Sequence, residues 1–293
     1  MFNRRDFLKF AAGTIFFSAG HPKVISKDRS VKQDVLLSFD GGTRDYGKMR
    51  EILRFSDELS SITGERANFT FFMISCLYFS SIKRKTEINL NGNRRDIEGI
   101  IEMTQIAIDA GHDLGNHSVR HLHGENWSYQ QWFDELSEFD GQIAGLFRDV
   151  EGKPYKARGF RAPYLEWGES MFPVLRDLDY SFDSSPIGDE IKTREGIVSI
   201  ELPVWRRDNG KRILSMDWNW GYWKVSNAEL QNMLQRESSR NPLIISLHFE
   251  DYGSGESQTY YEIVADFLRQ GTREGRFRFP SMKEYVKANF KSV

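Results

Sequence analysis

Three of the six histidines in the chain fall within the seven residues from 117 to 123. His117 and His121 have the i, i+4 spacing that places two side chains on one face of a helical turn, where both imidazoles could bind one metal ion. The same spacing is common in surface and helix-capping histidines, so by itself it leaves metal binding and a structural role both open. His112 and His123 are more typical of local hydrogen bonding than of metal ligation.

Other residues with reactive side chains follow predicted strands. Residues 34–39 and 242–248 are apolar runs typical of buried strands, and they end at Asp40-Gly41-Gly42 and at His248. Helices predicted at 46–63 and 97–110 alternate with strands, which implies parallel pairing. In a parallel barrel, side chains at strand ends converge on one face. The residues expected to meet there are Asp40, His117, His121, Arg161, Asp183 and His248.

Length and composition favour a single domain. A chain of 293 residues with 39% hydrophobic content can build one sizeable core, and further helices are predicted at 127–147, 169–178, 227–238, 257–270 and 281–290. Forty basic and forty-two acidic residues give a net charge of −2, so the basic footprint of a nucleic-acid-binding protein is missing. The lone Cys76 excludes an internal disulfide. We expect one domain over residues 27–293 and no nucleic-acid partner.

The first 26 residues differ from the rest. Arg4-Arg5-Asp-Phe-Leu-Lys precedes an apolar run at 11–19, which resembles a bacterial twin-arginine export signal and is too short to span a bilayer. We therefore expect residues 1–26 to be an export signal and linker recognised by the twin-arginine machinery. The protein would then be exported, to the periplasm or the extracellular space. No Ala-x-Ala cleavage site is evident, so removal of the signal stays open.

Four motifs occur in one order along the chain: Ser-Phe-Asp40-Gly-Gly, Gly-Asn-His117-Ser-Val-Arg-His121, Arg161-Ala-Pro-Tyr164 and Ser-Leu-His248. Together they resemble the motif set of the polysaccharide deacetylases, carbohydrate esterase family 4, over residues 34–248. The resemblance implies an α/β fold, a distorted (β/α) barrel with about seven units. It also implies removal of N-acetyl, sometimes O-acetyl, groups from N-acetylglucosamine or N-acetylmuramic acid units of chitin-like glycans or peptidoglycan, with a divalent metal that is usually zinc.

The resemblance assigns a role to each matching residue. His117 and His121 would bind the metal, which lowers the pKa of bound water. Asp40 would be the general base and His248 the acid that protonates the departing amine. Arg161 would hold Asp40 ionised. The remaining assignments are Tyr164, whose N–H would stabilise the oxyanion, Leu247, which would line the pocket for the acetyl methyl, and Asp183, which would orient His248.

Two departures from the family pattern matter. The first motif normally has two consecutive aspartates, the second being the third metal ligand, and here that residue is Gly41. Asp40 itself could ligate the metal, one of Asp45, Asp113 or His123 could substitute, or the metal could be lost. A further motif of the family, which lies between the Arg161 and His248 motifs, normally has a Trp after its Asp, and Asp183 lacks that Trp. We favour retained catalysis, because base, acid, arginine and both histidines persist; a carbohydrate-binding pseudoenzyme and a metal-free amidohydrolase are the alternatives.

Aromatic residues make up 14% of the chain, including seven Trp. Trp205 and Trp218 lie in Val-Trp-Arg-Arg and Met-Asp-Trp-Asn-Trp, where their rings could stack on sugar rings of a glycan substrate. Packing in the outer core is an equally good interpretation of such residues.

Overall fold

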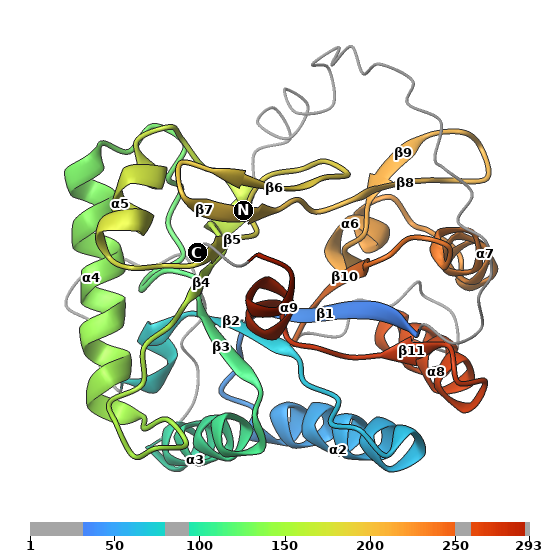
Figure 1. The fold of residues 1–293 in the computed structure, drawn as a ribbon, viewed down its shortest axis with the longest axis horizontal. Coiled ribbons are helices and arrows are strands. Elements are labelled where there is room, and N and C mark those ends of the chain that lie inside the picture. The colour runs from blue at the N-terminus through green and yellow to red at the C-terminus, as the bar shows by residue number, and fades with distance from the viewer. Residues whose placement is uncertain (1–31, 80–93, 250–258, 291–293) are drawn as a thin grey trace. The chain divides into compact units, whose positions relative to one another are not determined.

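The computed structural model describes residues 32–79, 94–249 and 259–290 (Figure 1). The predicted export signal, residues 1–26, lies outside the described residues, so its assignment stays a prediction. Within the described residues, no helix is long and apolar enough to cross a membrane.

A curled, mostly parallel sheet forms the centre of the fold, as predicted. Its strands lie in the order β10, β1, β2, β3, β4, β5, β7, β6; all neighbours are parallel except β6 and β7, and β11 pairs with the start of β1. The bounds in this order are Leu243–His248, Gln33–Gly41, Thr70–Met73, Asp113–Asn116, Gly159–Phe160, Phe182–Asp183, Ile197–Ile200 and Ile191–Arg194, with β11 at Phe277–Arg278. A separate hairpin joins β8 (Val204–Arg206) and β9 (Arg212–Leu214).

Helices cover the outside of the curl (Figure 1). The predicted helices are confirmed, with ends that follow local capping: Asp45 caps α2 through the N–H of Gly47, and Ser128 forms a capping box with Gln131 at the start of α4. The bounds are α2 Tyr46–Thr63, α3 Arg94–Ala110, α4 Tyr129–Leu146, α5 Met171–Asp177, α6 Asp217–Tyr222, α7 Asn227–Glu237, α8 Tyr260–Arg273 and α9 Met282–Asn289. Helix α6 and the 3₁₀ turns Ser75–Tyr78 and Pro163–Leu165 were not predicted.

The two faces of the sheet have different cores. Val35, Leu37 and Phe39 of β1 belong to the large cluster that the sheet shares with the surrounding helices. Leu36 belongs to a smaller cluster with residues of β2, β5, β7 and β10, closed by Met282 of α9, which lies across the sheet in Figure 1. Successive side chains alternate between the faces of a strand. Residues 38 and 40 therefore share the inner face with Leu36, and Asp40 points into the curl.

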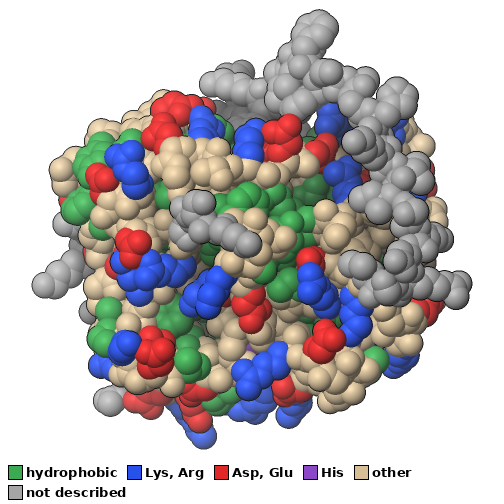
Figure 2. Space-filling model, in the orientation of Figure 1, with side chains coloured by type: hydrophobic (Ala, Val, Ile, Leu, Met, Phe, Trp, Pro, Cys, Tyr) green, Lys and Arg blue, Asp and Glu red, His purple; other side chains and the backbone are tan. Residues whose placement is uncertain are grey.

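Charged side chains of both signs are interspersed over the face shown in Figure 2. This mixture accords with the net charge of −2.

Candidate active site at the strand ends

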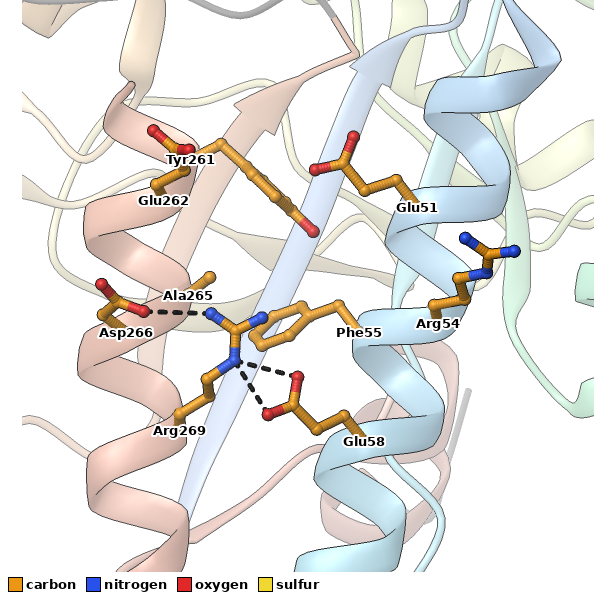
Figure 3. Close-up of a pocket in the computed structure, with 9 residues that line it drawn as sticks. All are labelled: Glu51, Arg54, Phe55, Glu58, Tyr261, Glu262, Ala265, Asp266 and Arg269. Carbon is orange, nitrogen blue, oxygen red and sulfur yellow. Dashed lines mark hydrogen bonds and ion pairs between the residues drawn. The ribbon is translucent and has the colours of Figure 1, made fainter. Parts of the chain in front are cut away.

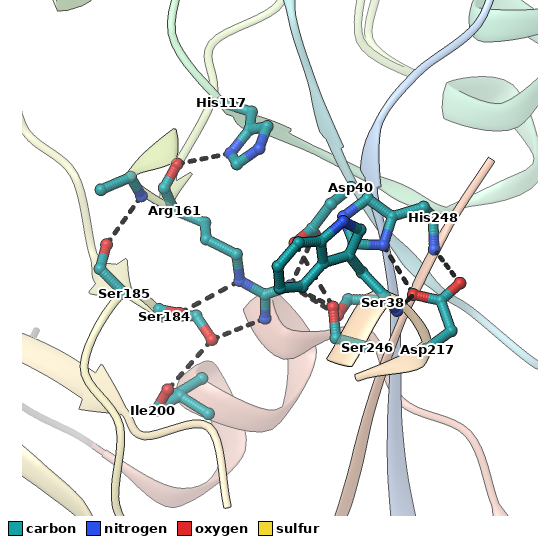
Figure 4. Close-up of polar contacts among 12 residues, drawn as sticks. Ser38, Asp40, His117, Arg161, Ser184, Ser185, Ile200, Asp217, Ser246 and His248 are labelled. Carbon is teal, nitrogen blue, oxygen red and sulfur yellow. Dashed lines mark hydrogen bonds and ion pairs between the residues drawn. The ribbon is translucent and has the colours of Figure 1, made fainter. Parts of the chain in front are cut away.

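Asp40 and His248 lie side by side at the ends of two neighbouring strands. The parallel register of β1 and β10 pairs Asp40 with His248 and Ser38 with Ser246, so all four residues face the inside of the curl. This arrangement is the one expected from the sequence for the base and the acid. The contacts around them are drawn in Figure 4.

A buried arginine fixes the carboxylate of Asp40. Arg161, fully buried after β4, donates from Nη1 to Asp40 Oδ1 at 2.6 Å. Its other donors reach Ser38 Oγ (3.0 Å), Ser246 Oγ (2.8 Å), Ser184 Oγ (2.8 Å) and the Ser184 carbonyl (3.1 Å). The guanidinium also lies 4.3 Å from the centre of the Phe72 ring. Burial lowers the pKa of Arg161, and the neighbouring Asp40 carboxylate opposes this. Each of the three guanidinium nitrogens thus has at least one hydrogen-bond acceptor inside the curl.

The partner of His248 is Asp217, at the start of α6. Asp217 Oδ1 lies 2.6 Å from His248 Nδ1, and Asp217 Oδ2 accepts the backbone N–H of His248 at 2.8 Å. A parallel bridge between Met216 and Ser246 places α6 beside β10 and so sets this contact. Because the carboxylate accepts from Nδ1–H, the Nε2 atom is the one directed away for proton transfer.

The predicted pairing of Asp183 with His248 is wrong. Asp183 pairs in register with Phe160, whose side chain packs in the helix-side cluster, so its carboxylate lies on the outer face of the sheet. There Oδ1 accepts the N–H of Ser185 at 3.1 Å, and burial raises the pKa of Asp183 to about 7. The sequence did contain a signal for the correct residue, because Asp217 is followed by Trp218, whereas Asp183 is followed by Ser184.

His117 and His121 are adjacent, although not on a helical turn. They follow β3 in a loop where Ser118 and His121 adopt positive φ angles of 72° and 56°, and their ring centres are 5.1 Å apart. Glu135, a buried residue of α4, accepts the N–H groups of Val119 and Arg120 at 2.9 and 3.0 Å and also contacts the Arg120 guanidinium. Sequence reasoning missed Glu135, which fixes the loop carrying both histidines.

Both imidazoles are suited to ligate a metal. His117 Nδ1 lies 2.7 Å from the carbonyl oxygen of Arg161, a contact that orients Nε2 outward. Burial lowers the pKa of His117 to about 4 and that of His121 well below its usual range, so both rings are neutral at neutral pH. Neutral imidazole is the form that binds metal.

A third ligand is missing from the described part of the chain, which holds no group of three His, Cys, Asp or Glu side chains able to bind one metal ion. Position 41, where the family pattern has an aspartate, is a glycine at φ 88°. Of the possible substitutes, Asp45 caps α2, Asp113 lies at the opposite end of β3 beside Tyr155, and His123 pairs with Glu166 at 2.9 Å. The residues present therefore do not fit a three-ligand zinc site.

Tyr164 lies beside this histidine pair. It occupies a 3₁₀ turn with φ 58°, and its ring contacts those of His121 (centres 4.5 Å apart) and His123 (4.1 Å, nearly parallel). The contact places Tyr164 at the site, as expected. Its role in stabilising an oxyanion stays a prediction.

Two other expected substrate contacts are wrong. Leu247 is buried in the helix-side cluster, because it alternates with Ser246 and His248 and so points away from them. Trp205 is fully buried and stacks on Trp220 with ring centres 5.5 Å apart, so it belongs to the core. Trp218 is only partly buried and directly follows Asp217, so it remains a candidate for substrate contact.

A pocket of about 360 Å³ lies elsewhere, between α2 and α8 (Figure 3). Three of its charged side chains pair with one another: Arg269 contacts Glu58 at 2.9 Å and Asp266 at 3.0 Å. It shares no residue with the strand-end cluster. We therefore place the candidate active site at the strand ends.

Comparison with known proteins bears on this site. The family model described as polysaccharide deacetylase matches residues 27–182, whereas no curated protein matches the sequence. Among solved structures, a putative polysaccharide deacetylase from Mycobacterium smegmatis shares 16% identity over 88% of this chain and 90% of its own, with a TM-score of 0.58.

Two further structures show the same fold. The Xyl-CE4 domain of a multidomain xylanase, from the hindgut metagenome of Trinervitermes trinervoides, is 16% identical, with 88% of this chain and 91% of that chain covered and a TM-score of 0.51. A CE4 family pseudoenzyme from Bacillus anthracis is 14% identical, with 86% and 65% covered and a TM-score of 0.52. These likenesses support the α/β barrel-like fold.

Proposed function

Since the chain belongs to the polysaccharide deacetylase family, we propose that it hydrolyses acetyl groups from an N-acetylated glycan. N-acetylglucosamine or N-acetylmuramic acid units of peptidoglycan or chitin-like oligomers are the proposed substrates. The observation that carries the proposal is the pairing of Asp40 with His248 in the register of β1 and β10. Buried Arg161 holds Asp40, and buried Asp217 holds His248. A base and an acid positioned separately suit amide hydrolysis, because the leaving nitrogen must be protonated.

The residues act in two proton transfers. Asp40 accepts a proton from a water molecule as that water attacks the acetamide carbonyl, while Arg161 holds the carboxylate in place. His248 then donates a proton from Nε2 to the sugar nitrogen as the C–N bond breaks, which yields acetate and a free amine. Asp217 fixes the tautomer of His248 and stabilises its positive charge.

We also propose that His117 and His121 contact a divalent metal, with zinc as the first candidate. When bound, such a metal supplies Lewis-acid activation of water or of the carbonyl. With two protein ligands in place of three, we expect its affinity to be low.

The test is acetate release by the purified protein from N-acetylglucosamine oligomers and from peptidoglycan. It is measured after chelation and again with zinc or cobalt restored, for the wild type, Asp40→Asn and His117→Ala. Release that disappears on chelation, returns with metal and is absent from both variants supports a metal-dependent deacetylase. Release that is indifferent to chelation and to His117→Ala supports a metal-free amidohydrolase.

The incomplete ligand set favours one second candidate, a carbohydrate-binding pseudoenzyme. This candidate predicts glycan binding with no acetate release at any metal concentration. A CE4 family pseudoenzyme has a similar fold. The acetate assay described above separates the two candidate functions.

Export remains a proposal that rests on the Arg4-Arg5 segment. We propose that the twin-arginine machinery carries the protein to the periplasm or beyond, where a cell-wall glycan would be accessible. Cell fractionation of the wild type and of a variant with Arg4→Lys and Arg5→Lys tests this. Equal export of both would contradict the proposal.

A further inference from the structure

Exposed aromatic side chains are concentrated at one place in the described chain. Tyr222 is 44% exposed and Trp223 is 36% exposed, and they are consecutive residues at the end of α6. The other described large hydrophobic side chains with this exposure, Ile106, Tyr129 and Val150, lie on α3, at the start of α4 and after α4. Contiguous exposed apolar surface commonly marks a binding site, whereas single exposed residues do not.

Helix geometry connects these rings to the candidate active site. Trp218 and Tyr222 have i, i+4 spacing, and their rings are nearly parallel with centres 5.6 Å apart. Tyr222 in turn meets Trp223 edge to face at 5.3 Å. The helix begins at Asp217, the partner of His248, so the three rings form a continuous surface that leads away from the acid. Six residues of helix span about 9 Å, which is longer than one pyranose ring.

Buried side chains and hydrogen bonds hold the surface formed by Trp218, Tyr222 and Trp223 in place. Trp220 is buried against Trp205 and Tyr260, and its Nε1 donates to the Leu214 carbonyl at 2.8 Å. Arg207 donates to the carbonyl oxygen of Trp223 at 3.1 Å and is itself paired with Glu229. A preformed surface loses little conformational entropy when a ligand binds.

We propose that Tyr222 and Trp223 form a binding site for additional sugar residues of a glycan chain whose acetylated unit lies between Asp40 and His248. The C–H face of a pyranose ring is apolar and flat enough to lie on an aromatic ring, so both apolar surfaces are removed from water while the sugar hydroxyls stay hydrated. Because the Tyr222 ring stacks on Trp218, which follows Asp217, this surface is continuous with the candidate active site. The inference rests on the proposed function and adds the place where sugar residues beyond the acetylated unit bind.

The experiment measures binding of the N-acetylglucosamine pentamer, its monomer and xylopentaose by calorimetry. The parent protein carries Asp40→Asn, so that the ligand is not consumed. Tyr222→Ala and Trp223→Ala are added singly and together, and Tyr222→Phe tests whether the ring alone suffices. Tyr129→Ala is the matched control, because Tyr129 is an exposed tyrosine remote from α6.

We expect the parent to bind the N-acetylglucosamine pentamer roughly tenfold or more tightly than the monomer. The double alanine variant should lose most of this advantage, whereas Tyr222→Phe and the Tyr129 control should keep it. Equal pentamer affinity in the parent and the double variant would overturn the proposal. So would a parent that binds neither pentamer, or that binds the pentamer no more tightly than the monomer.

Acetate release by the wild type is measured separately, so that failure of the proposed function can be told apart from failure of the aromatic binding site. If no acetate is released but pentamer binding requires the two rings, the proposed function fails and the aromatic site stands. If acetate is released but the rings do not affect pentamer binding, the aromatic site fails and the proposed function stands.

Discussion

The candidate site has two halves that are unequally complete. The acid–base half consists of Asp40 with Arg161 and His248 with Asp217, on strand ends in register and with each charge paired. The metal half consists of His117 and His121 on a loop with left-handed residues, and the position of the family's third ligand is occupied by Gly41. Strand register fixes the first half through many backbone bonds, whereas one missing side chain leaves the second without a third ligand. The proposed proton-transfer groups are therefore all in place, whereas we expect the proposed metal affinity to depend on the residue at position 41.

Breaking the Arg161–Asp40 pair should have the largest effect. Arg161→Met leaves the Asp40 carboxylate buried without its cation, which should cost about 3–5 kcal/mol of stability and abolish activity. Urea unfolding and acetate release measure the two effects. The matched control is Arg158→Met, which removes a surface contact with Asp179 and should cost about 1 kcal/mol or less. Similar losses from both substitutions would show that the buried pair has no special role.

Removing the partner of His248 should affect catalysis more than stability. Asp217→Asn keeps the shape of the side chain but permits the wrong tautomer of His248, so kcat should fall by about 10²–10⁴. Asp183→Asn is the control, since Asp183 lies on the other face of the sheet. If Asp183→Asn lowered kcat as much as Asp217→Asn, the assignment of the two carboxylates would be reversed.

The metal half can be completed by one substitution. A Cβ at position 41 would have Ile74 Cδ1 as its nearest neighbour, at 3.9 Å, so Gly41→Asp fits the space, and Asp tolerates positive φ better than most residues. We expect its zinc affinity, measured by calorimetry without substrate, to rise by at least about tenfold over the wild type. Gly41→Asn adds similar bulk and strain without the charge. Equal zinc affinities in the Asp and Asn variants would mean that position 41 does not reach the metal.

The smallest expected effect is on the pH dependence of stability, and it comes from Asp183. Unlike Asp40, this buried carboxylate has no arginine partner in the described part of the chain. Oδ2 of Asp183 has no hydrogen-bond partner among the described residues. Its folded-state pKa, about 7, is raised from the ordinary value of 3.8. Between these values the unfolded chain is ionised and the folded chain keeps its proton. Stability from this group therefore falls as pH rises from 4 to 7, by at most about 1.4 kcal/mol per pH unit.

Asp183→Asn should remove that contribution to the pH dependence. Thermal or urea unfolding at several pH values between 4 and 7 measures it, with Asp57→Asn, a change to an exposed carboxylate on α2, as the control. A slope unchanged by Asp183→Asn would mean that Asp183 is ionised in the folded protein throughout this range.

The sequence predicted the sheet and most helices because apolar runs, helical periodicity and capping residues act locally. It also predicted which residues meet, since parallel strands bring their ends together. It could not show that Ser118 and His121 adopt positive φ angles, which residues other than glycine rarely do. The two rings are adjacent, as the spacing would give on a helical turn, but the loop conformation brings them together instead.

The errors at Asp183, Leu247 and Trp205 have a common cause. Each residue lies in or next to a strand end, and sequence proximity did not show which face its side chain occupies. Strand alternation from His248 could have excluded Leu247. The Asp217-Trp218 pair could have indicated Asp217, but its contact with His248 depends on the bridge between Met216 and Ser246, which joins distant segments.

The pairing of β1 with β10 also has a consequence for the order of folding. The hydrogen bond from Ser246 to Asp40 joins residues 206 positions apart, so the proposed base and acid lie on strands that are neighbours in the sheet but distant in the sequence. Contacts of such high sequence separation form late, after the loop-closure entropy has been overcome. A nascent chain that has not yet emerged as far as β10 carries the proposed base and both histidines but lacks the proposed acid. The proposed site is therefore complete only after β10 has paired with β1.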